Sequence, residues 1–511
     1  MHAGLISITP DIMEDEGKLM FWLFEPTRPL VDDSLVIWFN GGPGCSSFHA
    51  GLFLEMGPVT TPLQPAGSFG QSSREPRVFN EYAWTNVTAV MYVEQPVGTG
   101  FSYGAEPPTD EEGVSTDFYH FMLNFYEIFP QHAPKRLYLV GESYAGYYVP
   151  SMAHKIYNMN KKAAKDKFVN LQGIALGNGW ADVDNQGPAV IDYAYWHGMI
   201  DSITRDAFHK EWEHCKQRTG EEPPPFHPLT TPDECGMMET VLKAAGAGLF
   251  DNMSPNTYDV TTWDKYFLLT DPVNTNTVFF NDPRVREKLH VPKEVDKDWA
   301  GCMPGAGRRR RRLKKDEELL PGQVLLKDDQ PISMVPYIAE LLDEAEIQIL
   351  IYNGDRDLST CAQGSERMLN GMEWSGHDDW LDLNSYKRAL WMVDGYPAGW
   401  SKSVKNLDFL IVYNSGHLVP YNVPKQAFDL VTRLVKNKPF GDVTIPVVFD
   451  PSVLPQEKKL LTSRSGGHLL PAFVGFLAGG AAVVAYLRFK EKRQQKSSYE
   501  VVGDVETEAM S

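Results

Sequence analysis

Four short apolar runs, each ending in a turn rich in glycine or asparagine, occupy much of residues 34–180. They are SLVIWFNGGPG (34–44), TAVMYVEQPVGTG (88–100), RLYLVGES (136–143) and LQGIALGNGW (171–180). A helical pattern at 118–129 separates the second run from the third. Alternating strands and helices predict an α/β fold with a mostly parallel central sheet and helices on both faces. In such a sheet, functional side chains gather at the carboxyl ends of the strands, where these turns lie.

The pattern changes between about residues 182 and 315, where proline-interrupted helical segments carry tryptophans and three cysteines. We predict that this part is an insertion that caps the functional site. The strand pattern returns with AEIQILIYNGDRD (345–357) and LDFLIVYNSGH (407–417), and a helix is expected at 424–435.

The segment LLPAFVGFLAGGAAVVAYL (469–487) contains 19 uncharged residues. At about 1.5 Å per residue, a helix of this length nearly spans a hydrocarbon core of roughly 30 Å. We predict a transmembrane helix here; the alternative is a buried C-terminal helix. Five basic residues follow it, Arg488, Lys490, Lys492, Arg493 and Lys496. They favour a cytosolic tail and therefore a single-pass type I membrane protein.

The expected division of the chain follows these changes in pattern. It comprises a first sheet-forming part (1–181), the helical cap with a basic loop (182–315), a second sheet-forming part (316–440), a stalk (441–468), the transmembrane helix (469–487) and the tail (488–511). The start, MHAGLISITPDIMEDEG (1–17), lacks the apolar run of a signal peptide. Either the sequence begins inside a longer chain or the apolar segment is a tail anchor that leaves the large part in the cytosol, where disulfides are rare. We favour the first interpretation.

Charge and composition exclude some classes of function. A formal net charge of -19 and a pI near 5.2 argue against a nucleic-acid binder, which needs a basic face. The run RRRRRLKK (308–315) is interpreted as a solvated loop or a cleavage site for maturation. Asn86 and Asn252 begin glycosylation sequons, usable only in a lumenal or secreted chain. The spacing of the five cysteines fits no zinc site, so neither a metal nor a cofactor is expected.

The third run delivers one serine within Gly141-Glu142-Ser143-Tyr144-Ala145-Gly146. A strand followed by G-x-S and small residues resembles the nucleophile elbow, a sharp strand-to-helix turn that exposes the serine oxygen. Alanine replaces the second glycine of the general motif. A serine hydroxyl becomes a useful nucleophile only when a base accepts its proton and a carboxylate orients that base.

The two later strands supply both groups. Asp355 and Asp357 follow one strand and His417 follows the next, which gives the chain order Ser, Asp, His of an α/β-hydrolase. The backbone N–H of Tyr144 is the first expected oxyanion donor, and Gly42 in the loop WFNGGPGCSS (38–47) is the second.

Four motifs in order, WFNGGPGCSS, EQPVGTGFSY, GESYAG, and GDRD with NSGHLVP, resemble the serine carboxypeptidase family over roughly residues 3–440. The resemblance implies that Ser143 is the nucleophile, His417 the base, and Asp357, rather than Asp355, the orienting carboxylate. It also implies disulfides Cys45–Cys302 and Cys215–Cys235, with Cys361 as a free thiol near the site. This sequence departs from the family in placing Cys361 four residues after Asp357, where three is common, and in having Leu418 where methionine is frequent.

The resemblance explains the glutamate beside the serine. In the family, this glutamate and two residues of the first loop hold the free C-terminal carboxylate of a peptide; here they are Glu142, Asn40 and Gly41, with Trp38 beside them. Glu55 matches a glutamate that hydrogen-bonds the elbow glutamate. A buried group that must pair with a carboxylate just beyond the scissile bond rejects mid-chain peptides, so only the last residue is removed.

The expected function is a serine carboxypeptidase of an acidic lumen, in the Golgi, an endosome or a vacuole or lysosome, acting on peptide or protein C-termini. The C-terminal layout is similar to membrane-bound Golgi carboxypeptidases that trim Lys and Arg from prohormones. The tail motif YEVV (499–502) fits a signal for a sorting adaptor. The alternatives are an acyltransferase on the same fold and a non-catalytic binding or protective subunit.

Overall fold

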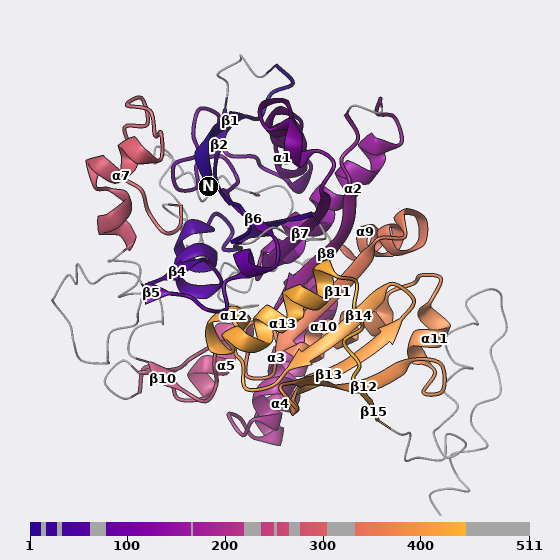
Figure 1. Cartoon of the computed structure of the whole chain (residues 1–511). Helices are drawn as coiled ribbons and strands as arrows, with labels where there is room; N and C mark the ends of the chain where they lie inside the picture. Colours follow the sequence, from indigo (N-terminus) through magenta and orange to yellow (C-terminus); the bar gives the residue numbers. More distant parts are fainter. Residues whose placement is uncertain are drawn as a thin grey trace, which may run out of the picture. The chain divides into compact units, whose positions relative to one another are not determined.

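Eleven strands form one sheet in the computed structural model, which describes residues 1–11, 17–27, 33–61, 78–164, 167–218, 237–249, 253–264, 276–303, 326 and 333–445. The strand order is β1-β2-β6-β3-β7-β8-β11-β14-β13-β12-β15, and the sheet belongs to the compact unit Met1–Val447 (Figure 1). The six central strands are parallel: β6 (Ala89–Glu94), β3 (Ser34–Phe39), β7 (Arg136–Glu142), β8 (Leu171–Gly177), β11 (Gln348–Gly354) and β14 (Leu407–Val412).

The sheet is mixed, because antiparallel strands flank the parallel centre on both sides. These are β1 (His2–Ser7) and β2 (Lys18–Phe24) at one edge, and β13 (Tyr396–Val404), β12 (Lys387–Val393) and β15 (Val443–Thr444) at the other. The sequence patterns predicted the centre and missed these flanks. Of these strands, β12, KRALWMV, is half-exposed, whereas β2, KLMFWLF, is mostly buried.

Successive residues of β3 pack into two separate cores, one on each face of the sheet. Leu35, Ile37 and Phe39 join a cluster that contains Phe118 and Phe121 of α1 (Glu111–Ile128) and much of α2 (Ala145–Asn160). Val36 and Trp38 join a second cluster with residues of α13 (Pro424–Val435). All of β3 and β6 is buried, because helices cover both faces as predicted.

The insertion is helical over its first part, with α3 (Val183–Trp196), α4 (Ser202–Arg218) and α5 (Met237–Ala244). A short hairpin of β9 (Ser254–Pro255) and β10 (Trp263–Asp264) follows, and then α7 (Pro283–Lys288). Helix α3 packs against α4, α5 and α10 (Ala362–Gly371). The other short elements are η1 (Phe48–Glu55), β4 (Val59–Thr60), β5 (Val78–Phe79), η2 (Trp84–Asn86), η3 (Pro130–His132), α9 (Val335–Glu340), η5 (Leu341–Ala345), α11 (His377–Leu381) and α12 (Val419–Asn422).

Several predictions from the sequence lie outside the described residues. These concern the basic loop 308–315, Asn252, Cys235, the span 469–487 and the tail motif 499–502; Cys215 lies in α4, but its side chain is not described. Across the described part of the chain, no helix combines the length and apolar character needed to cross a membrane.

Candidate active site

Ser143 lies in the sharp turn between the end of β7 at Glu142 and the start of α2 at Ala145. Its φ is 64°, a left-handed conformation that is uncommon for a residue other than glycine and is typical of strained functional positions. The backbone around it is firmly held: the Ser143 carbonyl accepts hydrogen bonds from the amides of Gly146 and Trp180, both at 2.9 Å. This geometry matches the nucleophile elbow predicted from the sequence.

Small residues around the elbow allow close contact between chain segments. A Cβ on Gly146 would lie 2.4 Å from the Trp180 carbonyl oxygen, so no larger residue fits without movement. A Cβ on Gly141 would lie 2.6 Å from the Cβ of Ala145. Ala145 therefore fits in place of the motif's second glycine because Gly141 leaves room for its methyl group.

His417 and Asp357 form a buried pair at the carboxyl ends of β14 and β11. The Nδ1 of His417 lies 2.7 Å from Oδ2 of Asp357, and the two side chains are 1% and 0% exposed. The choice of Asp357 over Asp355 agrees with this contact, because the Asp355 carboxylate instead accepts a hydrogen bond from the Ser415 amide at 3.2 Å.

Four further groups donate to the Asp357 carboxylate. The Nδ2 of Asn178 and the Oγ1 of Thr360 each lie 2.7 Å from Oδ2, the Thr360 amide lies 3.3 Å from the same oxygen, and the Ser359 amide lies 2.8 Å from Oδ1. Sequence reasoning missed these groups. The signal available for Asn178 was its place directly after β8, at the same sheet edge as the predicted site. Several donors to one buried carboxylate keep it fixed and able to orient His417.

The insertion reaches His417 through Tyr258. The two rings stack with centroids 4.1 Å apart at 15°, and the Tyr258 carbonyl accepts a hydrogen bond from the His417 amide at 2.8 Å. This contact was not predicted. On the other edge of the imidazole, Nε2 is buried and has no hydrogen-bond partner among the described residues, so it can receive a proton from a nucleophile.

Glu142 and Glu55 place two buried carboxyl groups next to the elbow. The Nδ2 of Asn40 donates to Oε1 of Glu142 at 3.3 Å, and Asn40 is itself oriented by the indole N–H of Trp38 at 2.8 Å and the Gly51 amide at 3.0 Å, both on its Oδ1. Trp38 is fully buried, and its indole N–H is used on Asn40. It therefore supports the predicted binding group Asn40 by orienting its side chain.

The two carboxyl groups hold protons more strongly than ordinary glutamates. Burial, and then the neighbouring Glu55, raise the pKa of Glu142 well above its usual value. Burial raises the pKa of Glu55 to about 7, against the opposing effect of its contacts with Glu142 and Asn40. Two adjacent carboxyl groups in one buried place cannot both ionise easily, so the pair retains a proton at acidic and near-neutral pH.

Protein stability is expected to fall as the pH rises from about 4.5 to 7 because of this pair. The folded protein retains protons there that the unfolded chain releases, and stability decreases with pH wherever the folded state binds more protons. From the raised pKa of Glu55 we expect a contribution on the order of 2–3 kcal/mol. Melting temperatures at about pH 5 and pH 7.5 test this, with Glu55→Gln as control. The same slope in both proteins would contradict the assignment.

The first loop, residues 40–47, packs directly against the elbow. A Cβ on Gly41 would lie 2.3 Å from the Tyr144 amide nitrogen, and Gly42 adopts a φ of 115°. The predicted disulfide Cys45–Cys302 is confirmed and links this loop to the end of the insertion. Cys361 forms no disulfide and is buried, and burial raises the pKa of its thiol to about 12.

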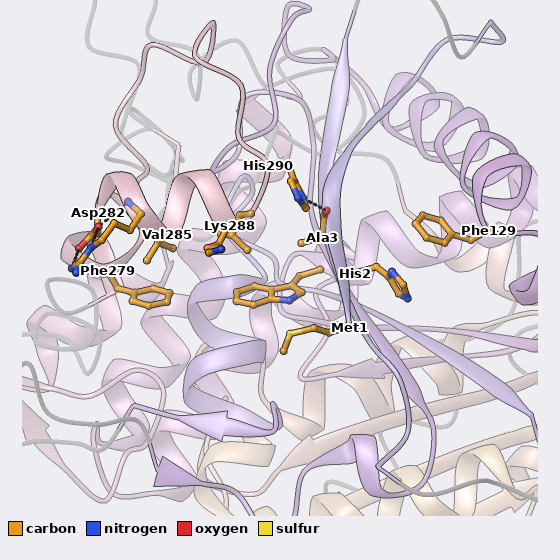
Figure 2. A pocket seen from close by; sticks show the side chains of 12 residues that line it. Met1, His2, Ala3, Phe129, Phe279, Asp282, Val285, Lys288 and His290 are labelled. Carbon is orange, nitrogen blue, oxygen red and sulfur yellow. Dashed lines mark hydrogen bonds and ion pairs between the residues drawn. The ribbon is translucent and has the colours of Figure 1, made fainter.

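A cavity of about 900 Å³ lies elsewhere, between the start of β1 and α7 (Figure 2). Its lining is mainly apolar, with an ion pair between Arg284 and Asp282 and a hydrogen bond from His290 to the Ala3 carbonyl. Neither Ser143 nor His417 lines it, so this cavity is not the site of the chemistry predicted for the elbow. Among the described residues, no cluster of three histidine, cysteine or acidic side chains is arranged to hold a metal ion.

Comparison with known families agrees with this geometry. The family described as serine carboxypeptidase matches residues 1–437. The chain belongs to the serine carboxypeptidase family. Within it, this member is 31% identical over 454 residues to the pheromone-processing carboxypeptidase of Paracoccidioides lutzii, an alignment that covers 85% of this chain and 64% of that protein.

Other relatives within the family match more of their own length. Serine carboxypeptidase-like 49 of Arabidopsis thaliana is 33% identical over 453 residues, covering 87% of this chain and 78% of that protein. Serine carboxypeptidase S10 family member 2 of Dictyostelium discoideum is 28% identical over 509 residues, covering 95% and 82%. The crystal structure of a prohormone-processing carboxypeptidase from Saccharomyces cerevisiae shares the fold with a TM-score of 0.71 at 24% identity, covering 87% of this chain and 94% of that one.

Proposed function

We propose that this family member is a serine carboxypeptidase that releases C-terminal amino acids from peptides through an acyl-enzyme on Ser143. The observation that carries the proposal is that a cleavage site and a carboxylate-binding site lie next to each other at the carboxyl end of β7. The elbow serine, with the His417–Asp357 pair, supplies the means of peptide-bond cleavage. The residue before it, Glu142, belongs to a buried, proton-holding carboxyl pair suited to recognising a carboxylate.

The reaction starts when the Ser143 hydroxyl attacks the carbonyl carbon of the last peptide bond while Nε2 of His417 accepts its proton. Asp357 stabilises the imidazolium that forms. The amides of Gly42 and Tyr144 donate to the oxyanion of the tetrahedral intermediate. The close packing of the first loop on the elbow supports this assignment, since a Cβ on Gly41, the residue before Gly42, would lie 2.3 Å from the Tyr144 amide nitrogen. His417 then protonates the leaving amine, and water releases the acyl group by the reverse proton transfers.

Recognition of the free C-terminus falls to the carboxyl pair. A protonated Glu142 donates a hydrogen bond to the substrate carboxylate, joined by the side-chain amide of Asn40 and the backbone of Gly41. Glu55 keeps the proton on the pair, and Trp38 orients Asn40. A substrate without the carboxylate leaves these buried polar groups unpaired, and this penalty restricts cleavage to the last residue.

The proposal also covers the type of substrate peptide and the location of the protein in the cell. The names of the relatives, pheromone-processing and prohormone-processing carboxypeptidases, support peptide precursors as substrates. Trimming of basic C-terminal residues from such precursors is part of the proposal. The apolar segment 469–487 and the basic residues after it support a single membrane span with the large part in the lumen. The motif at 499–502 would then be cytosolic and accessible to a sorting adaptor.

The proposal predicts that the full-length protein in detergent releases the last amino acid from N-blocked dipeptides with a free C-terminus. C-terminally amidated copies of the same dipeptides should react at least about 100-fold more slowly, since they lack the recognised carboxylate. Chromatography of released amino acids measures both rates, and Ser143→Ala is the control. Equal cleavage of both substrate sets would contradict carboxylate recognition, and release that persists in the variant would contradict the serine mechanism.

A further inference from the structure

Glu94 is a buried carboxyl group that the reaction above does not use. It is the last residue of β6, where it pairs with Met20 of β2, and it is 0% exposed. It begins the motif EQPVGTGFSY, and that motif has no part in the chemistry proposed above. A charged or protonated carboxyl in such a place needs hydrogen-bond partners, because burial without them is costly.

Three segments of the chain donate hydrogen bonds to this one carboxyl group. The Ser46 hydroxyl, in the first loop, lies 2.5 Å from Oε1, and the indole N–H of Trp299, in the insertion, lies 2.7 Å from the same oxygen. The Phe101 amide lies 2.8 Å from Oε2. Glu94 therefore joins the first loop, its own following loop and the end of the insertion.

The loop after β6 is folded closely around Glu94. A Cβ on Gly100 would lie 2.0 Å from Oε1, so the glycine allows the backbone to pass beside the carboxyl group. The Ser102 hydroxyl donates to the Glu94 carbonyl at 2.5 Å. Lys297 donates hydrogen bonds to the carbonyls of Gly98 and Ser102, each at 2.8 Å, and so connects the two ends of this loop. Its positive charge also stabilises the ionised form of Glu94.

The first loop is the part of this arrangement that matters for the reaction. Ser46 is next to Cys45, whose disulfide to Cys302 ties the same loop to the same end of the insertion. Asn40, Gly41 and Gly42 lie three to five positions before Cys45 in the same loop. A shift of the loop would displace the proposed oxyanion donor and the proposed carboxylate-binding groups together.

We propose that Glu94 is a positioning residue that holds the first loop, through Ser46, at the place where Asn40, Gly41 and Gly42 meet the substrate. The inference rests on the proposed function for its consequence in catalysis. Burial raises the pKa of Glu94 to about 7, and the donors from Phe101, Ser46 and Trp299, together with Lys297, oppose this effect. The ring of His49 lies edge-on to Trp299, with centroids 6.4 Å apart, and burial lowers the pKa of His49 to about 4.

Glu94→Gln is the sharpest test because it keeps the shape and removes one acceptor. Whichever way the amide is turned, its N–H₂ group meets a donor, either the Phe101 amide or the Trp299 indole. We expect kcat per active site to fall about 10- to 100-fold, as for a small misplacement of reacting groups. Active sites are counted by titration with a fluorophosphonate, so a loss of folded protein alone would leave this number unchanged.

Ser46→Ala removes the link to the first loop while Glu94 keeps its other two donors. It should lower kcat per active site in the same direction, and the double variant should lose less than the sum of the two single effects, because both changes act on one hydrogen-bonded group. Asp408→Asn is the matched control: the Asp408 carboxyl is half-buried and bonded to Ser403, and it lies at the start of β14, the end of that strand away from His417. That variant should keep the activity of the unmodified protein.

The rate constant for labelling of Ser143 by the fluorophosphonate separates this inference from the proposed function. If the protein cleaves no peptide but labelling slows in Glu94→Gln and Ser46→Ala, the positioning role stands and the peptidase proposal fails. If labelling and kcat per active site in either variant equal those of the unmodified protein, Glu94 only fills space and the inference is overturned. Ser46→Ala decides the matter alone if Glu94→Gln does not fold.

Discussion

Replacing Ser143 by alanine is expected to lower kcat for peptide hydrolysis by about 10⁴- to 10⁶-fold, the effect of removing the nucleophile of a serine triad. The strained turn at Ser143 and the unpartnered Nε2 of His417 are the physical reasons, because the proposed mechanism uses the Ser143 oxygen as nucleophile and Nε2 as its base. The released amino acid is measured with a substrate carrying a free C-terminus. An organophosphate should also label Ser143 covalently, and His417→Ala should abolish this labelling.

A second serine of the same helix-turn region provides a matched control. Ser151 is buried in α2, and its hydroxyl donates to Glu111 at 3.2 Å and to the Tyr148 carbonyl at 3.0 Å, which are structural bonds. Ser151→Ala should retain labelling and most activity. Peptide mapping that places the label on a serine other than Ser143 would refute the elbow assignment. Full biological activity in Ser143→Ala would instead favour the non-catalytic binding subunit.

The order of chemistry along the chain was predictable because parallel strands end at one edge of the sheet. Ser143, Asp357 and His417 each follow a strand, so their separation of up to 274 positions along the chain did not hide their proximity. The position of a residue after a strand did not decide which aspartate orients His417. Asp355 and Asp357 follow the same strand, and only the family resemblance, and then the 2.7 Å contact with His417, separated them.

Groups that act through another side chain were harder to predict. Asn178 and Thr360 are recognisable only once Asp357 is placed, and Tyr258 belongs to an insertion whose path no local pattern defines. Trp38 shows the opposite case. Its position beside the binding loop was predicted, but its burial, which gives it a role in orienting Asn40, depends on packing from the other face of the sheet. Local patterns predict where a strand ends; they do not predict which neighbours a buried side chain meets.

The second large effect concerns pH and the carboxyl pair. Because burial and Glu55 raise the pKa of Glu142, the residue is protonated at acidic pH and can donate to the substrate carboxylate. As the pH rises through that pKa the pair loses its proton, and an ionised Glu142 repels the substrate. KM for peptides with a free C-terminus is expected to rise about tenfold per pH unit above the pKa, while esters and amides, which lack the carboxylate, show no such rise.

Two substitutions separate this explanation from a general effect of pH. Glu142→Gln stays neutral at every pH, so KM for free-acid peptides should become nearly independent of pH. Glu55→Gln removes the charge and the contact that raise the pKa of Glu142, so in that variant KM should start to rise at a lower pH. Because neutral His417 is needed for turnover, kcat is recorded separately from KM. An unchanged pH dependence of KM in Glu142→Gln would show that another group recognises the C-terminus. A shift to higher pH in Glu55→Gln would show that the two carboxyl groups do not share a proton.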